Sequence, residues 1–350
     1  MKTKKNNQLY KPKGGFISRI EILPLLMGLA IGFLLGFLIT SPKKNKVNKQ
    51  TETENTLTEI RSGGWYKFTN PLLDCDNFKP SVLKTHVELV NALNDYVKKA
   101  LLNEDASQIS VYFRSLNNGP WVGINEKEYY TPASLLKLPI LIATLKKAEN
   151  DPALLKMRIN YNTPYDTIYK PNIKDTTCIK LGKAYTVDEL LKYMIVHSDN
   201  EAKEIMVHLI SNDFIMNVME ELGVNLKNRN LSIDFISVKE YSSFFRILYN
   251  ASYLNRNMSE KALELLSQTN YNKGITNKLP KDLVVSHKFG ERGFENSQLK
   301  QLHDCGIIYL PDNPYLLCVM SRGFDFEKLS KVISDVSLIV YNNVKNDYKQ

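Results

Sequence analysis

The stretch Thr131-Pro-Ala-Ser-Leu-Leu-Lys-Leu-Pro-Ile140 places a hydroxyl and an amine three residues apart in an otherwise apolar run. In a helix, Ser134 and Lys137 would lie on one face within reach of each other. The neighbouring leucines partly remove the Lys137 amine from water, which lowers its pKa and prepares the neutral amine to take the Ser134 proton. Because a Ser and a Lys at this spacing are common by chance, the pair indicates catalysis only if partners stand elsewhere in the chain.

Two further short motifs follow in chain order. Residues 198–200 read Ser-Asp-Asn at the end of a predicted helix, and residues 288–290 read Lys-Phe-Gly in a predicted strand. Ser134 follows a predicted hairpin and opens a helix, where the first backbone N–H groups have no helical partner. The combination S-x-x-K, S-D-N and K-T-G is the signature set of serine β-lactamases and penicillin-binding proteins. The first two motifs match fully, and the third has Phe289 in place of its hydroxyl residue.

From about residue 80 to its C-terminus, the chain therefore resembles the acyl-serine transferase superfamily, and most closely the class A β-lactamase type of catalytic domain. The resemblance implies Ser134 as the acylated nucleophile, Lys137 as its base or proton partner, and Ser198 as a proton relay toward the leaving nitrogen. It also implies Asn200 as a contact to the substrate amide. Lys288 would be the positive group near Ser198 and the substrate carboxylate.

The resemblance further implies an oxyanion hole made by the backbone N–H of Ser134 and that of Glu291, the residue after Gly290. We interpret the run Glu291 to Gly293 as a turn with a solvated ion pair. Arg292 within it is a candidate to bind the substrate carboxylate in place of the missing hydroxyl.

A second departure concerns release of the acyl group. β-Lactamases of this type carry an E-x-x-L-N loop between the second and third motifs, and its glutamate activates the deacylating water. The nearest match, residues 221–225 (Glu-Leu-Gly-Val-Asn), ends a predicted helix, and only residues 226–233 separate it from the next helix region. This segment is too short to fold a loop across the site. We therefore expect no dedicated deacylation base.

Two functions fit these features. The first is a serine hydrolase or acyltransferase, β-lactamase-like or DD-peptidase-like, that is acylated by β-lactams or D-alanyl peptides and releases the acyl group slowly. The second is a binding or sensing module for β-lactams or peptidoglycan that keeps the fold without turnover. The intact polar groups of the first two motifs favour the enzyme, because burying them without a use is costly.

The order of sequence patterns predicts an α+β fold. Strand patterns occur at residues 109–116, 121–124, 283–289, 305–310 and 315–321. Helical patterns occur at residues 87–102, 186–195, 201–210, 213–222, 238–249, 259–267 and 326–343. Strands at both ends with helices between them predict an antiparallel sheet flanked by helices. The resemblance adds an all-helical subdomain of the β-lactamase/transpeptidase type.

The charge is distributed unevenly. Residues 1–50 hold ten of the 46 Lys and Arg residues and one of the 37 Asp and Glu residues, so the other 300 residues carry 36 of each sign. A neutral main domain argues against nucleic acid as a partner. The basic residues lie on both sides of an uncharged apolar run of 18 residues, 22–39, which is just long enough to span a bilayer core.

These features predict a single-pass membrane protein. The poor cleavage site after residue 40 favours an anchor over a signal peptide, and the six basic residues before the run favour a cytoplasmic N-terminus. We predict a basic cytoplasmic tail at 1–20, a transmembrane anchor at 21–40, an extracytoplasmic linker at 41–79 and an extracytoplasmic catalytic domain at 80–350. A helix places Gly28, Gly32 and Gly36 on one face, which fits a dimer contact as well as the general frequency of glycine in membrane helices.

The cysteines and histidines do not have metal-ligand spacing, so no metal or other cofactor is expected. Cys305 and Cys318 flank a predicted turn at residues 311–314. Pairing residue 310 with residue 315 would place them diagonally on one face, which is long for a disulfide, so we expect two free buried thiols. His197 and His287 precede motif residues, and we interpret both as structural neighbours.

Overall fold

The computed structural model describes residues 60–61, 66–74, 84–117, 119–165, 172–173, 177–226, 230–231, 233–294 and 297–347. The described residues belong to one compact unit. The predicted tail and anchor, including the glycine face at residues 28–36, lie outside the described residues. Within the described ranges, no helix is long and apolar enough to cross a membrane.

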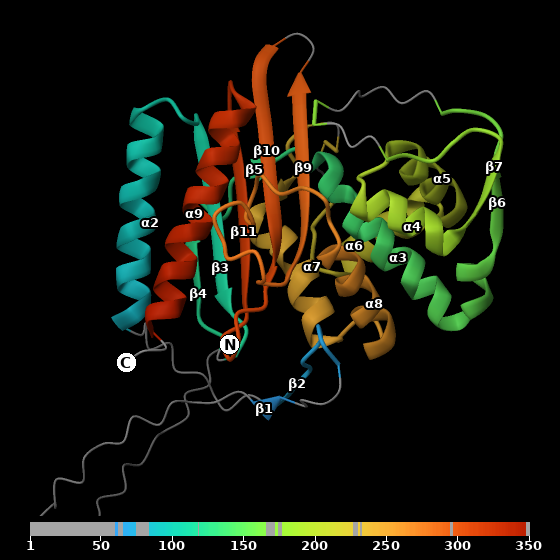
Figure 1. Ribbon diagram of the computed structural model, residues 1–350, viewed down its shortest axis with the longest axis horizontal. Coiled ribbons are helices and arrows are strands. Elements are labelled where there is room, and N and C mark those ends of the chain that lie inside the picture. Colours follow the sequence, from blue (N-terminus) through green and yellow to red (C-terminus); the bar gives the residue numbers. More distant parts are fainter. Residues whose placement is uncertain are drawn as a thin grey trace, which may run out of the picture. The chain divides into compact units, whose positions relative to one another are not determined.

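The central element is a five-stranded antiparallel sheet in the order β4-β3-β11-β10-β9 (Figure 1). Its strands are β3 (Gln108–Ser115), β4 (Trp121–Ile124), β9 (Val285–Phe294), β10 (Ser297–Ile308) and β11 (Tyr315–Gly323). Consecutive residues of β11 alternate between two apolar cores, as the period of two in a strand requires. The predicted α+β fold with an antiparallel sheet is confirmed. The strands β4 and β9 form the two edges of the sheet.

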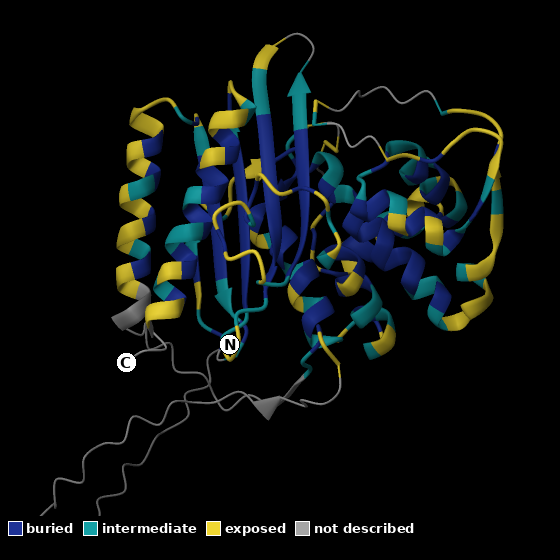
Figure 2. Ribbon diagram, in the orientation of Figure 1, coloured by how far each residue is buried: buried dark blue, intermediate teal, exposed yellow. Residues whose placement is uncertain are grey.

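Helices cover both faces of the sheet. On one face lie α2 (Lys84–Leu102) and α9 (Phe326–Asp347), side by side in Figure 1. On the other face lies a helical region made of α3 (Lys137–Asn150), α4 (Val187–Val196), α5 (Asn200–Ile210), α6 (Asn212–Glu221), α7 (Val238–Asn250) and α8 (Arg256–Ser267). Figure 2 shows the buried positions gathered along the central strands and the helices that face them.

Short elements complete the described chain. Three two-stranded sheets pair β1 (Ile60–Arg61) with β2 (Leu72–Asp74), β5 (Tyr129–Tyr130) with β8 (Ile236–Ser237), and β6 (Arg158–Tyr161) with β7 (Lys183–Thr186). Two 3₁₀ helices, η1 (Ala133–Leu136) and η2 (Pro152–Lys156), lie before and after α3.

Within the predicted linker, residues 66–71 pack on the helical region. The Glu260 carboxylate accepts hydrogen bonds from the backbone N–H groups of Lys67, Phe68 and Thr69 at 2.6 to 2.9 Å. The Phe68 ring is buried against Tyr309. Ordered contacts with the body therefore occur before residue 80.

Local sequence signals explain the helix boundaries. The predicted capping box is present, since the Thr186 side chain and the Glu189 carboxylate bind each other's backbone N–H at the start of α4. Pro139 lies in the first turn of α3, where a missing N–H removes no helical hydrogen bond. The residues of α3 from Lys137 to Leu145 are all buried, as expected for a helix that is apolar on every side.

The prediction of two free thiols is wrong. Ile308 pairs with Tyr315, so the strand register is shifted by two residues from the predicted pairing and Cys305 lies directly opposite Cys318. Their Cα atoms are 4.0 Å apart, and the two residues form a buried disulfide between β10 and β11. The sequence located both strands, but it did not settle how many residues the turn between them uses.

We expect the disulfide to stabilise the fold. Closing a 13-residue separation restricts the unfolded chain, and loops of this size contribute roughly 3 kcal/mol. The double substitution Cys305→Ala with Cys318→Ala should lower the free energy of unfolding by ~2–4 kcal/mol, measured by urea denaturation with the slope fitted separately for each variant. Cys178→Ala, which removes the exposed free thiol, is the matched control. Equal midpoints for the two variants would contradict a stabilising disulfide.

Candidate active site

A strained turn precedes the serine of the first motif. After β5 the chain passes through Thr131 and Pro132 into η1, and Ala133 has a φ of 50° in the left-handed region, which alanine rarely adopts. Ser134 follows within η1, and α3 begins at Lys137. Strained backbone of this kind persists where the surroundings determine it, and it is common at functional sites.

The Lys137 amine joins the first two motifs. Its Nζ lies 3.1 Å from Ser134 Oγ, 3.0 Å from Ser198 Oγ and 2.8 Å from Asn200 Oδ1. A further hydrogen bond of 2.5 Å runs to the backbone carbonyl of Ser198. The side chain is 1% exposed, and burial, followed by the nearby charges of Lys288 and Lys203, holds the pKa of Lys137 well below its usual value.

The second motif has a local reason for its shape. Ser198 has a φ of 54°, and Asp199 caps the N-terminus of α5 by accepting a hydrogen bond from the Ala202 N–H. The other Asp199 oxygen accepts from the Ile179 N–H at 2.8 Å. The aspartate thus fixes the turn, which directs the residues on both sides of it toward Lys137.

The third motif reaches the same place from the edge strand β9. Lys288 Nζ lies 3.1 Å from Ser198 Oγ and 3.0 Å from the carbonyl oxygen of Phe289. The side chain is fully buried, and this burial, partly offset by the Asp304 carboxylate, lowers the pKa of Lys288 to about 7. The hydroxyl of Ser198 therefore stands between two buried amines.

Gly290 allows β9 to approach the serine turn. A Cβ atom at this position would lie 2.7 Å from the carbonyl oxygen of Pro132 and 3.0 Å from the backbone nitrogen of Leu135. Both contacts are with backbone, which cannot move aside cheaply. Glycine is therefore required for the edge strand to lie against η1, and this approach brings the Glu291 backbone next to the turn.

The predicted motif residues thus converge in one polar cluster around two buried amines, which we call the lysine cluster: Ser134, Lys137, Ser198, Asn200 and Lys288. Residues 91–344 match the model of the beta-lactamase enzyme family. The chain belongs to this family. It is a serine hydrolase of the beta-lactamase family, and the resemblance drawn from the three motifs is confirmed.

Similar proteins agree with this membership. The chain is 22% identical to beta-lactamase VEB-1 of Pseudomonas aeruginosa over 266 residues, which cover 70% of this chain and 88% of the relative. A beta-lactamase of Phocaeicola vulgatus is 25% identical over 278 residues, 73% of this chain and 85% of that protein. Among solved structures, TLA-1 extended-spectrum beta-lactamase aligns with a TM-score of 0.63 at 19% identity, covering 73% of this chain and 99% of that one. PBP-A aligns with a TM-score of 0.61 at 19% identity, covering 74% and 96%.

This family member departs from the K-T-G motif in a specific way. The Phe289 ring is 7% exposed and stacks on Tyr271, with ring centroids 4.1 Å apart. Lys288 Nζ lies 4.3 Å from the centroid of the same ring. The position that the motif gives to a hydroxyl therefore holds an aromatic ring in contact with the lysine.

The prediction of a turn at residues 291–293 is wrong. These residues continue β9, and Glu291 is 3% exposed. Its carboxylate accepts hydrogen bonds from the backbone N–H groups of Asn172 and Ile173 at 2.5 and 2.9 Å, and from Asn172 Nδ2 at 3.0 Å. The partners lie 119 and 118 residues earlier in the chain, so no local signal marked them. Arg292 places its guanidinium 5.5 Å from the ring centroid of Phe294.

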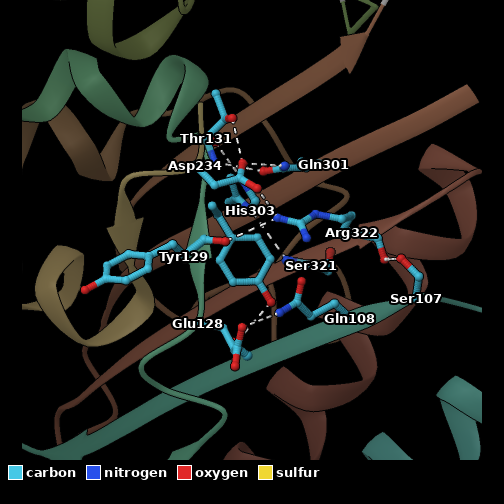
Figure 3. A network of polar contacts seen from close by, with 12 residues as sticks. Ser107, Gln108, Glu128, Tyr129, Thr131, Asp234, Gln301, His303, Ser321 and Arg322 are labelled. Carbon is cyan, nitrogen blue, oxygen red and sulfur yellow. Dashed lines mark hydrogen bonds and ion pairs between the residues drawn. The ribbon is translucent and has the colours of Figure 1, made fainter. Parts of the chain in front are cut away.

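A second polar network holds the backbone before the nucleophile (Figure 3). Gln301 Oε1 accepts from the Thr131 N–H at 3.0 Å, and His303 Nε2 lies 3.0 Å from the Thr131 carbonyl oxygen. Asp234 accepts from the Thr131 hydroxyl and from Gln301 Nε2, each at 2.8 Å, and pairs with Arg322. Both backbone groups of Thr131 are thereby fixed, three residues before Ser134.

The His303 ring in this network has one defined tautomer. Its Nδ1 accepts from the Ser321 N–H at 3.3 Å, so the proton is on Nε2 and is donated to Thr131. Burial lowers the pKa of His303 to about 4, and the ring stays neutral at physiological pH. Gln301 and His303 are polar residues two positions apart, on one face of a buried strand. This alternation is the sequence signal that could have indicated the network.

The side chains of the other residues considered from sequence make their described contacts outside the lysine cluster. His287 pairs with Asp304 at 2.9 Å in the sheet interior, and His197 Nδ1 lies 3.1 Å from Asn270 Nδ2. Glu221 ends α6, where its carboxylate accepts a hydrogen bond from the Tyr253 hydroxyl. None of these three is a hydrogen-bond partner of the lysine cluster in the described part of the chain.

Gly290 provides a test of the approach between β9 and η1. Gly290→Ala introduces the backbone clashes given above, and we expect covalent labelling of the protein by a fluorescent penicillin to fall at least ~10²-fold, comparable to losing an oxyanion donor. Gly293→Ala on the same strand is the matched control, because the described atom nearest to its Cβ would be Asn172 Nδ2 at 3.4 Å, an ordinary contact. Labelling that falls equally in both variants would argue against a special role for the close contact between β9 and η1.

Proposed function

We propose that this chain is a membrane-anchored extracytoplasmic serine hydrolase of the β-lactamase or penicillin-binding type, which forms an acyl-enzyme at Ser134 with β-lactams or D-alanyl peptides. The observation that carries the proposal is the buried Lys137 amine, which contacts the nucleophile candidate and both polar groups of the second motif. Its lowered pKa provides the neutral amine that serine activation requires.

In the proposed acylation reaction, a proton moves between the residues of the lysine cluster. Lys137 Nζ takes the Ser134 proton while Oγ bonds to the substrate carbonyl carbon, and the backbone N–H groups of Ser134 and Glu291 bind the resulting oxyanion. Collapse of the intermediate breaks the carbon–nitrogen bond. The proton held by Lys137 then reaches the leaving nitrogen through Ser198 Oγ, which lies within hydrogen-bond distance of both lysine amines.

Substrate recognition rests on the neighbouring groups. Asn200 binds the substrate amide, and the Lys288 ammonium attracts the substrate carboxylate. Phe289 supplies no hydroxyl to this carboxylate, and Arg292 on the same strand is the candidate replacement. Replacement of Arg292 with Ala leaves labelling unchanged if the arginine has no such role.

Release of the acyl group should be slow. Glu221, the glutamate of the nearest E-x-x-L-N match, is hydrogen-bonded to Tyr253 at the end of α6. In the described contacts, no Asp or Glu side chain is hydrogen-bonded to Ser134 or Lys137. Among the described residues, these contacts therefore offer no carboxylate to activate the deacylating water. A solved structure of the same fold, a mutant of PBP-A, is named as an acyl-enzyme complex with penicillin G.

Anchoring through residues 21–40 follows from the apolar run, with the N-terminus cytoplasmic and the catalytic domain outside the cytoplasm. A dimer through Gly28, Gly32 and Gly36 belongs to the same proposal. The disulfide between Cys305 and Cys318 supports an oxidising compartment for the catalytic domain.

The second candidate is a non-turnover binding or sensing module. Phe289 at the hydroxyl position favours it, because a hydroxyl contact to the substrate is lost there. Lys137→Ala separates the two functions, since reversible binding by such a module tolerates the change, whereas acylation requires the amine.

Intact-protein mass over time tests acylation and release together. Incubation with a penicillin should add the mass of one β-lactam within minutes, and the adduct should persist for hours after the free drug is removed. Ser134→Ala should show no adduct, and Lys137→Ala should acylate at least ~10²-fold more slowly. Absence of an adduct on the unaltered chain would refute acylation, and its rapid loss would refute slow release alone.

Lys288 gives the reaction a characteristic pH dependence. Because its pKa is lowered to about 7, the amine is charged below this pH and neutral above it. Preference for a β-lactam carboxylate over its methyl ester, measured as the ratio of acylation rates, should be largest near pH 6 and fall several-fold by about pH 8.5. In Lys288→Arg, which stays charged, the ratio should not change with pH. A falling ratio in that variant would assign the titration elsewhere.

A further inference from the structure

A cavity lies at the β4 edge of the sheet, opposite to β9. It has a volume of about 520 Å³, between strands β3 and β4 on one side and the end of α6, the strand β8 and the first turns of α7 on the other. We call it the basic pocket. Its lining includes Arg114, Lys127, Lys239 and Arg246.

Among the described residues, no ion pair neutralises these four cations. None of them takes part in an ion pair within the described part of the chain, and Glu240 is the one carboxylate in the lining. The Glu240 carboxylate is already bound to the backbone N–H and the hydroxyl of Ser237, each at 3.0 Å, in the capping box of α7. Residues 51–350 carry equal numbers of acidic and basic side chains, so the excess is local to the pocket.

Aromatic rings give the pocket a defined wall. Trp121 stacks on Tyr112 with ring centroids 5.6 Å apart and an interplanar angle of 20°. Lys239 Nζ lies 4.4 Å from the Trp121 ring centroid, a cation–π distance that orders the lysine beside the cavity. Trp121 and Tyr129 are each 43% exposed.

We propose that the basic pocket binds a ligand that carries two or more phosphate groups. Two arginines and two lysines converge from β3, the turn before β5, and two turns of α7, so one singly charged carboxylate would leave most of the positive charge unmatched. Arginine forks bind phosphate oxygens in pairs, while lysines supply point charges. The first turn of α7 adds the positive end of a helix dipole to the same wall.

The pocket is separate from the lysine cluster, because β4 and β9 are opposite edges of the sheet. The proposal therefore does not depend on the proposed function. Two sources share this chemistry, a soluble polyphosphate compound and the clustered headgroups of an anionic lipid surface. The probes below distinguish them.

Trp121 provides the readout. The chain has two tryptophans, and Trp65→Phe leaves Trp121 as the single emitter. The full-length Trp65→Phe chain in neutral detergent is titrated with inorganic tripolyphosphate, and separately with micelles of the same detergent containing phosphatidylglycerol or phosphatidylcholine. We expect a saturable change of Trp121 emission with tripolyphosphate, with phosphatidylglycerol micelles or with both, and none with phosphatidylcholine.

Charge-removing variants locate the binding. Arg114→Gln with Lys239→Gln should weaken binding about tenfold or more. Lys127→Gln with Arg246→Gln removes two other cations, both exposed, at low risk to folding and should also weaken it. Lys98→Gln with Lys99→Gln on α2 removes the same charge from the opposite side of the sheet and should leave binding unchanged.

No saturable response to either phosphate probe, or equal weakening in the α2 control, overturns the proposal. All variants should keep penicillin labelling at Ser134.

Discussion

The catalytic arrangement depends on one buried amine. Lys137 is the first residue of α3, a helix whose surroundings are apolar. Its nitrogen is hydrogen-bonded to oxygens from two segments: Ser134 in η1, directly before α3, and residues 198–200 at the start of α5. A charged ammonium in this position would be costly, whereas the neutral amine can donate to the two carbonyl oxygens, of Ser198 and of the Asn200 side chain, and accept from a serine hydroxyl. Burial of Lys137 thus holds two segments together and also favours the neutral amine that the proposed function requires, so the packing of α3 and the proposed chemistry have one cause.

The geometry around this amine is maintained from the sheet side. Gly290 lets the edge strand β9 lie against the serine turn, and residues of β10 hold both backbone groups of Thr131. The left-handed conformations at Ala133 and Ser198 each cost on the order of 1–3 kcal/mol and persist only under such constraints. The active-site turns are therefore determined by tertiary contacts more than by their own sequences.

The difference between local signals and tertiary contacts explains what the sequence could predict. Periodicity located the helices and strands, and three motifs located the residues that the fold brings together, because each signal lies within a few residues. The pairing of Cys305 with Cys318 depends on how many residues a turn uses, and periodicity does not contain that number. The sequence predicts a solvated turn at residues 291–293, whereas the donors that bury the Glu291 carboxylate lie far along the chain, at residues 172–173.

The two lysines of the site are coupled through one hydroxyl. Both are buried within hydrogen-bond distance of Ser198 Oγ, and the charge of Lys288 is one reason for the low pKa of Lys137. Positive charge on Lys288 favours the neutral form of Lys137, while the Asp304 carboxylate favours the charged form of Lys288. In the proposed function, two side chains of one type take the different roles of base and electrostatic anchor because different charges surround them. The Ser198 hydroxyl between them is where the two roles are coupled.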